Sequence, residues 1–151
     1  QVIGEFSPDW VRPMAEALRI IGTTHSLVVH GVDGIDEISV SGDTLVAEIG
    51  HGEINEYTLT PAMIGLRPSP MSALAGGSPQ HNAEFIRKLL KGEPGPFRNI
   101  VCANAGAGLY VLREAESLAA GLTLASEAID SGRANLALQR LVAVSNGEEV
   151  T

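Results

Sequence analysis

Two adjacent carboxylates, Asp36 and Glu37, are the residues of this chain whose types and spacing best suit chemistry. They follow an apolar run at residues 27–29 and a His30-Gly31 pair, which predicts a buried strand that ends in a glycine-containing loop. Ligands of open α/β sheets bind beyond the carboxyl ends of strands. Mg²⁺ takes one or two carboxylates and completes its shell with water and phosphate oxygens. The pair is therefore a candidate Mg²⁺ site, with a solvent-exposed turn as the alternative interpretation.

Other residues that could take part in chemistry have simpler structural interpretations. His30 closes a buried strand, where a hydrogen-bonded structural role is the expectation and ligand contact is the alternative. Residues 104–108 (NAGAG) lie in a helical pattern and lack the third glycine of a phosphate-binding loop, so we expect close helix packing there. Gly76 and Gly77 predict a turn before a helix, with anion binding at the helix start as the alternative. Three further histidines lack metal-ligand spacing: His25, His51 and His81.

The elements that must position the acidic pair follow from periodicity and from turn residues. Pro13 conflicts with a regular helix start and predicts an irregular first turn. In the first half we expect a short strand at 1–6, a helix from 7 to 22, a buried strand at 26–30, a β-type segment at 38–40, and a hairpin of strands 45–49 and 53–59 around a three-residue loop, 50–52.

The second half is predicted to be helical. We expect a helical turn at 60–64, a loop at 65–77, a helix at 78–92 that starts with a Ser78 cap, a long helix at 97–120 broken at Gly121, and helices at 122–130 and 134–144 before a frayed tail. The fold class is α/β: a partial central β-sheet with flanking helices and a largely helical C-terminal portion. A sheet of four short strands is thin for this length, which predicts that partner strands lie elsewhere.

Composition limits the classes of function. The 151 residues suit a single domain, 1–151. The net charge of −8 argues against a nucleic-acid or anionic-membrane surface. Nothing approaches the roughly 18 consecutive apolar residues of a membrane span. The single cysteine, Cys102, cannot form an internal disulfide, and with no visible signal peptide this predicts a cytoplasmic protein.

Five segments resemble the anthranilate phosphoribosyltransferase family of tryptophan biosynthesis, which shares the class II nucleoside phosphorylase and phosphoribosyltransferase fold. The resemblance covers residues 1 to about 144 and corresponds to the second half of the family. It rests on QVIGEFSPDWVRPMAEALRIIGT, VVHGVDGIDEISV, INEYTLTP, GGSPQHNAEFIRKLLKGEPGP and AIDSGRA.

The resemblance implies a helical domain beside an α/β domain with a central sheet. It also implies transfer of a phosphoribosyl group from phosphoribosyl pyrophosphate to the amine of anthranilate, with release of pyrophosphate. Asp36 and Glu37 match the family's acidic pair that binds Mg²⁺. The resemblance further implies a homodimer formed through helices that this chain does not contain.

The chain departs from the family in one large respect. The family's glycine-rich pyrophosphate loop and its anthranilate-binding residues belong to the first half, and no segment here matches them. We therefore expect an N-terminal half, in the same chain or in another, to complete the enzyme, and the segment alone to be inactive. Two alternatives stay open: a non-catalytic relative that binds nucleic acid, which the charge of −8 and the acidic pair oppose, and a related pyrimidine nucleoside phosphorylase.

Overall fold

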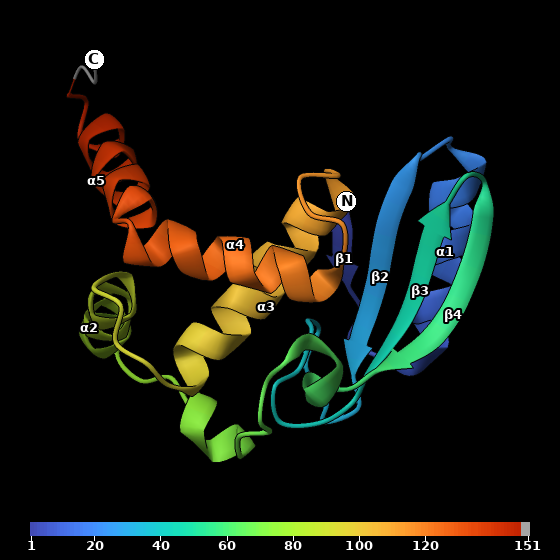
Figure 1. The fold of residues 1–151 in the computed structure, drawn as a ribbon, viewed down its shortest axis with the longest axis horizontal. Helices are drawn as coiled ribbons and strands as arrows, with labels where there is room; N and C mark the ends of the chain where they lie inside the picture. Colours follow the sequence, from blue (N-terminus) through green and yellow to red (C-terminus); the bar gives the residue numbers. More distant parts are fainter. Residues whose placement is uncertain (149–151) are drawn as a thin grey trace.

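The computed structural model describes residues 1–148, and all of its strands form one mixed sheet, as Figure 1 shows. Residues 149–151, which the predicted domain and its frayed tail include, lie outside the described residues. The sheet has the order β1-β2-β3-β4, with β1 parallel to β2 and the other pairs antiparallel. The strands are β1 (Val2–Gly4), β2 (His25–Gly31), β3 (Thr44–Gly50) and β4 (Glu53–Leu59).

Within residues 1–148 five α-helices accompany the sheet, and the predicted α/β class is confirmed. In Figure 1, α1 lies along one face of the sheet and α3 and α4 lie on the other side. None of the helices within residues 1–148 has the length and apolarity that crossing a bilayer requires. The helices are α1 (Val11–Ile20), α2 (Pro79–Leu90), α3 (Pro96–Val111), α4 (Leu118–Asp130) and α5 (Arg133–Ser145).

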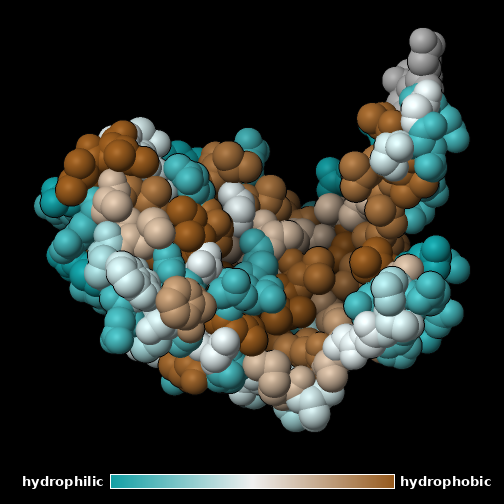
Figure 2. All heavy atoms as spheres, turned by 180° about the vertical axis from the view of Figure 1, so that it is seen from behind, coloured by the Kyte–Doolittle hydropathy of each residue, from teal (hydrophilic) through white to brown (hydrophobic). Residues whose placement is uncertain are grey.

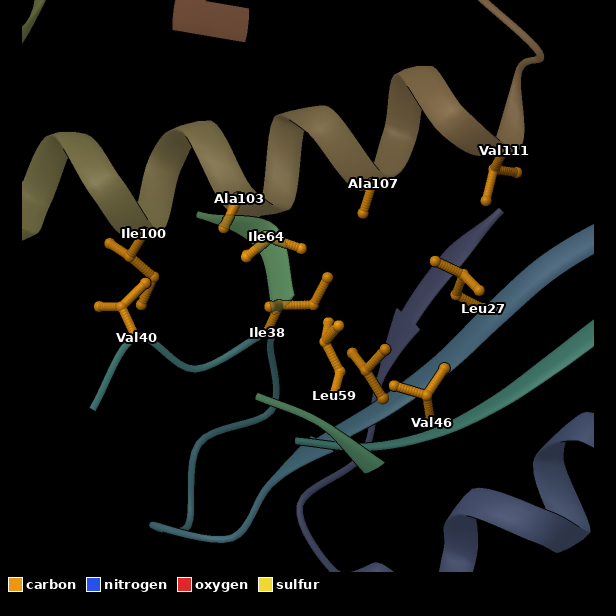
Figure 3. Packing of buried hydrophobic residues seen from close by; sticks show 11 residues of the cluster. Leu27, Ile38, Val40, Val46, Leu59, Ile64, Ile100, Ala103, Ala107 and Val111 are labelled. Atoms are coloured by element: carbon orange, nitrogen blue, oxygen red, sulfur yellow. The ribbon is translucent and has the colours of Figure 1, made fainter. Parts of the chain in front are cut away.

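The central strands β2 and β3 are buried on both faces, because side chains alternate along each strand and each face of these strands is covered. On one face Val28, Ala47 and Ile49 pack against the apolar stripe of α1. On the other, shown in Figure 3, Leu27 and Val46 pack against α3. The continuous apolar run of β2 is explained by this double coverage, as predicted. The α3 residues in this cluster recur every three or four positions and are Ile100, which lies beside Val40 of the β2–β3 connection, and Ala103, Ala107 and Val111.

The start of the first helix is irregular, as Pro13 predicted. A 3₁₀ turn at Pro8–Trp10 precedes α1, and the Ser7 hydroxyl accepts a hydrogen bond from the Asp9 amide at 3.4 Å. Pro13 is then the third residue of α1, where no intrahelical partner for its nitrogen is needed. The caps predicted at Ser78 for α2 and the helical turn after Thr60 are also confirmed.

Two predictions for the strands are wrong. The hairpin has a two-residue loop, because Gly50 pairs with Glu53, and positive φ at His51 (52°) and Gly52 (81°) gives the turn the twist that tight hairpins prefer. Residues 38–40 are buried but form no strand. Side chains satisfy this segment instead, since the Ile38 amide donates to Asn104 Oδ1 at 2.9 Å.

The long helix predicted at 97–120 is two helices, and Gly121 does not break either. The chain turns after α3 at Arg113, whose φ is 63°, and α4 begins after a Ser117 cap. Gly121 lies inside α4, where a Cβ atom would be 2.2 Å from the Gly106 carbonyl oxygen. The small residues at 104–108 therefore permit close helix crossing, as predicted, and Gly121 serves the same contact from α4.

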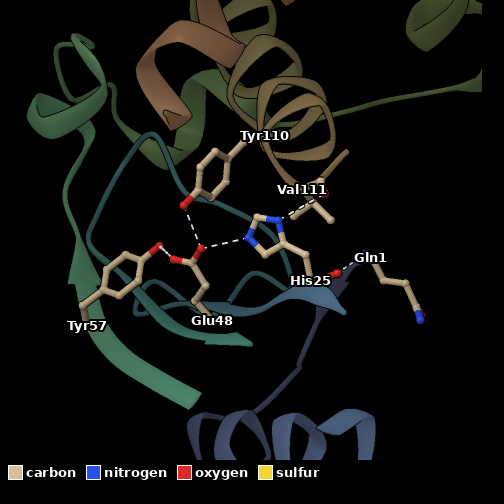
Figure 4. Close-up of polar contacts among 6 residues, drawn as sticks. All are labelled: Gln1, His25, Glu48, Tyr57, Tyr110 and Val111. Atoms are coloured by element: carbon tan, nitrogen blue, oxygen red, sulfur yellow. Dashed lines mark hydrogen bonds and ion pairs between the residues drawn. The ribbon is translucent and has the colours of Figure 1, made fainter. Parts of the chain in front are cut away.

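A polar cluster ties the end of α3 to the sheet, as Figure 4 shows. Glu48 of β3 accepts hydrogen bonds from Tyr110 at 2.7 Å and Tyr57 at 3.1 Å. His25 Nε2 lies 2.9 Å from Glu48, and its Nδ1 lies 3.1 Å from the Val111 carbonyl oxygen. Burial and the Glu48 carboxylate raise the pKa of Tyr110 to about 12, so its hydroxyl remains a donor at neutral pH.

Helix α5 extends from the body and has no fully buried residue within its described range. An apolar groove of about 280 Å³ lies where α2, α3, α4 and α5 meet. Figure 2 shows apolar side chains gathered in this hollow and continuing onto the projecting helix. On α5 itself, Leu141 and Val144 expose 64% and 60% of their surface.

The close crossing of α3 and α4 predicts that a single methyl group added at Gly121 strongly destabilises the protein. We expect Gly121→Ala to lower the free energy of unfolding by more than about 2 kcal/mol, because the backbone of α3 must move to admit it. Gly108→Ala is the matched control in α3, where an added Cβ meets nothing within 4 Å. The control should be stabilising by up to about 1 kcal/mol. Equal denaturant midpoints for the two variants would contradict this packing.

Candidate functional site

The acidic pair lies in the connection between β2 and β3, at the carboxyl ends of the parallel strands β1 and β2. The connection folds back on itself at its start, where the Gly31 amide donates to the Ile35 carbonyl at 2.9 Å. Its two ends are joined by the Val32 amide, which donates to the Asp43 carbonyl at 2.9 Å. This is the position at which ligands of open α/β sheets bind.

Gly4, the last residue of β1, sets the position of Asp36. A Cβ atom on Gly4 would lie 1.5 Å from the Asp36 carbonyl oxygen, so only glycine allows the loop to rest there. The chain that leaves β1 is held against β2 because His30 Nδ1 lies 2.8 Å from the Glu5 carbonyl oxygen. The structural role predicted for His30 is therefore confirmed.

Asn104 of α3 fixes the other side of the pair. Its side chain accepts from the Ile38 amide at 2.9 Å and donates to the Ile38 carbonyl at 3.0 Å, so it satisfies both backbone groups of that residue. It also donates to the Ile100 carbonyl within its own helix at 3.0 Å. The backbone around Asp36 and Glu37 is thus held from β1 on one side and from α3 on the other.

Asp33 holds the loop in shape through side-chain hydrogen bonds. It accepts hydrogen bonds from the hydroxyl groups of Ser39, at 2.5 Å, and Ser41. Partial burial raises the pKa of the Asp33 carboxyl, but these hydrogen bonds outweigh it and hold the pKa below its ordinary value. A Cβ atom on Gly31 would lie 2.6 Å from Asp33 Oδ1, so the side chains of the loop pack closely over this glycine.

The acidic pair itself is exposed to solvent. Partial desolvation of Glu37 and the neighbouring charge of Asp36 raise the pKa of Glu37, because both disfavour its charged form. Within residues 1–148 no three His, Cys, Asp or Glu side chains gather into a metal site. Two adjacent carboxylates fit a hard cation such as Mg²⁺, which takes its remaining ligands from water or a phosphorylated substrate.

The position predicted for the two adjacent glycines before α2 is confirmed. Gly76 and Gly77 form the turn before α2, and the Gly77 amide donates to the Asn82 side chain at 2.8 Å. The three residues that sequence reasoning did not assign to the site are Gly4, Asp33 and Asn104. A glycine inside a strand pattern and a polar residue inside a helical pattern were the available signals.

Comparison with known proteins places the chain among glycosyl transferases. It matches the glycosyl transferase family, a/b domain, over residues 1–135. The anthranilate phosphoribosyltransferase of Mesorhizobium japonicum is 48% identical over 147 residues, which are 97% of this chain and 44% of that protein. The enzyme of Hyphomonas neptunium is 49% identical over 144 residues, which are 95% of this chain and 42% of that protein.

Solved structures agree with this placement. A crystal structure of anthranilate phosphoribosyltransferase from Thermus thermophilus superposes with a TM-score of 0.84 at 48% identity, covering 93% of this chain and 41% of that one. The Saccharomyces cerevisiae enzyme in complex with PRPP and Mg superposes with a TM-score of 0.82 at 25% identity, covering 91% of this chain and 40% of that one. The chain thus spans about two fifths of the length of these relatives.

The network around Asp33 predicts a pH-dependent contribution to stability. Because its folded-state pKa lies below the ordinary value of 3.8, the ionised carboxyl stabilises the fold above that pH. The contribution is lost as pH falls through the lowered folded-state pKa. We therefore expect Asp33→Asn to be destabilised relative to the unsubstituted protein at pH 7, with a difference that shrinks toward pH 3.

The measurement is denaturant unfolding across this pH range. Asp43→Asn is the matched control, because Asp43 lies in the same connection and its side chain makes no hydrogen bond or ion pair within the described residues. A difference between the Asp33 variant and the unsubstituted protein that stays constant with pH would contradict the role of the Asp33 charge.

Proposed function

The chain belongs to the glycosyl transferase family whose α/β domain it matches, and from this premise we propose that it forms the α/β part of an anthranilate phosphoribosyltransferase. The observation that carries the proposal is identity of 48–49% to such enzymes over nearly the whole chain. The reaction would transfer a phosphoribosyl group from phosphoribosyl pyrophosphate to the amine of anthranilate and release pyrophosphate, within tryptophan biosynthesis in the cytoplasm.

In this proposal Asp36 and Glu37 hold Mg²⁺. Their place beyond the carboxyl ends of β1 and β2 supports the assignment. When bound, the ion would neutralise the charge that develops on pyrophosphate as it departs. The chain's own contribution is to position the two carboxylates: Gly4 and Asn104 hold the backbone on either side, so little reorganisation is needed when the ion and substrate arrive.

The rest of the enzyme is proposed to come from outside these residues, in the same chain or in another. Two features of the described residues support this. Strand β1 pairs only with β2, so its other edge is open to further strands. The apolar groove beside α5 is uncovered, and a packed enzyme would bury it. The added part would supply a pyrophosphate-binding loop and the anthranilate contacts, and would mediate a homodimer.

The first test is a charge-removing substitution in the complete enzyme. We expect Asp36→Asn to reduce kcat/KM for phosphoribosyl pyrophosphate by about 10²-fold or more, because one stabiliser of the departing pyrophosphate is weakened. Glu37→Gln should act in the same direction, and raised Mg²⁺ should recover part of the loss. Steady-state kinetics over a Mg²⁺ series, beside a thermal melt, measure both effects.

Asp43→Asn is again the control, since it removes a carboxylate from the same connection without touching the pair. It should leave kcat/KM within about twofold. An Asp36→Asn enzyme with unchanged kinetics would refute the assignment of the metal ligand. Unchanged melting of that variant is also expected, because Asp36 is exposed and its side chain packs against no buried residue cluster.

The second test concerns the 151-residue segment by itself. We expect no detectable phosphoribosyl-anthranilate from it, because the pyrophosphate loop and anthranilate contacts are proposed to lie outside it. The measurement is a product assay on a sample whose intact mass confirms that only these residues are present. Turnover by such a sample would show that the segment carries a complete active site.

A further inference from the structure

A hollow lined by arginine, threonine, histidine and glycine residues lies at the other end of the sheet from the acidic pair. It has a volume of about 350 Å³ and is formed by the end of α1, the turn between β3 and β4, and Arg113, two residues beyond the end of α3. Thr23 and Thr24, which line it, directly precede β2, whereas Asp36 follows the end of that strand. The seven residues of β2 separate the two sites by about 20 Å.

The hollow is basic within an acidic protein. Three of its lining side chains are Arg19, Arg113 and His51, and its lining includes no carboxylate. The chain as a whole has 18 acidic and 10 Lys or Arg residues, so this composition is not that of the average surface. Within residues 1–148 neither of these arginines forms an ion pair; the arginines that do are Arg12 and Arg98.

The backbone of the hollow is unusual in the same place. In the part of the chain that the structure describes, the non-glycine residues with positive φ are His51, at 52°, and Arg113, at 63°, and both line it. The hairpin turn explains the conformation of His51, but it does not explain that of Arg113. The Arg113 amide donates to the Tyr110 carbonyl, and the Glu114 amide donates to the Leu109 carbonyl. These two hydrogen bonds form a Schellman motif, in which the position of Arg113 is usually occupied by glycine. An arginine there lowers stability, and such strain gathers at functional sites.

Helix ends offer a simpler explanation for the two arginines. Arg19 lies in the last turn of α1 and Arg113 lies two residues beyond the end of α3, and basic residues stabilise the negative end of a helix. Each helix end carries only about half a negative charge, so the two guanidinium groups leave the hollow net positive. The helix-end explanation also does not account for the left-handed residue, since a basic side chain one turn earlier would serve without strain.

We propose that this hollow binds the phosphate group of a small molecule. Guanidinium groups present paired donors that match phosphate oxygens, and the Thr23 and Thr24 hydroxyls with the His51 ring add further donors around the same space. The proposal does not depend on the reaction proposed above, because it uses none of the residues near Asp36.

The test is a titration of the complete enzyme with inorganic phosphate in the presence of EDTA. Sodium chloride of equal ionic strength is the control titration. Binding is measured by the melting temperature of the protein and by the ³¹P line width of phosphate. Phosphate should raise the melting temperature. Arg113→Gly should melt higher than the unsubstituted protein without phosphate, because the strain is relieved, yet lose at least half of the phosphate-dependent rise. Arg19→Gln should lose a similar part of that rise, and Arg140→Gln, an exposed arginine of α5, should lose none.

The phosphate responses of these variants decide whether the hollow binds phosphate. An unchanged phosphate response in both Arg19→Gln and Arg113→Gly would overturn the proposal. An equal loss in Arg140→Gln would also overturn it, since only overall charge would then be at work. A lower melting temperature of Arg113→Gly with an intact phosphate response would assign Arg113 to the helix end alone. Because no Mg²⁺ is present and no turnover is measured, these results are independent of the acidic pair.

Discussion

The packing of α3 is the constraint on which the rest of the structure depends. One side of this helix buries Ile100, Ala103 and Ala107 against the sheet and against the β2–β3 connection. Another side brings Gly106 against the backbone of α4. Between them, Asn104 satisfies the backbone of the loop that carries the acidic pair. The hydrophobic contact and the site are therefore coupled, because a displaced α3 would also leave buried polar groups of Ile38 without partners.

The acidic loop shows how a fold can hold two like charges next to each other. Its shape comes from backbone hydrogen bonds, the Asp33 carboxylate and the glycines at 4 and 31, and not from the side chains of Asp36 and Glu37. Those two carboxylates remain exposed and free of side-chain partners within the described residues. Their mutual repulsion costs stability, a cost that a bound cation would remove.

The acidic pair and the basic hollow lie at opposite ends of the sheet. The acidic pair lies beyond the carboxyl ends of β1 and β2, and the basic hollow lies beyond the start of β2. Both locations are built from loops and helix ends, where side chains can face solvent without disturbing the core. The buried sheet between them keeps the two sets of charges apart, so each can be altered while the other is left in place.

The sequence by itself determined the features that depend on near neighbours along the chain. Periodicity and capping are local properties, so several features were predictable from them. These are the apolar run of β2, the Ser78 cap of α2, the helical turn after Thr60, the irregular helix start near Pro13 and the acidic pair after His30. The family assignment was also predictable from quoted segments, and the match over residues 1–135 confirms it. The metal role of Asp36 and Glu37 stays a prediction.

Only the tertiary structure decided the features that depend on distant partners. Residues 38–40 have a strand pattern but are held by Asn104, which lies 66 positions further on. Gly121 reads as a helix breaker, yet it is required inside α4 because Gly106 packs against it. Gly4 supports the site because the Asp36 backbone rests on it. In each case the local preference is worth about 1 kcal/mol or less, and a close contact or a buried hydrogen bond between distant segments outweighs it.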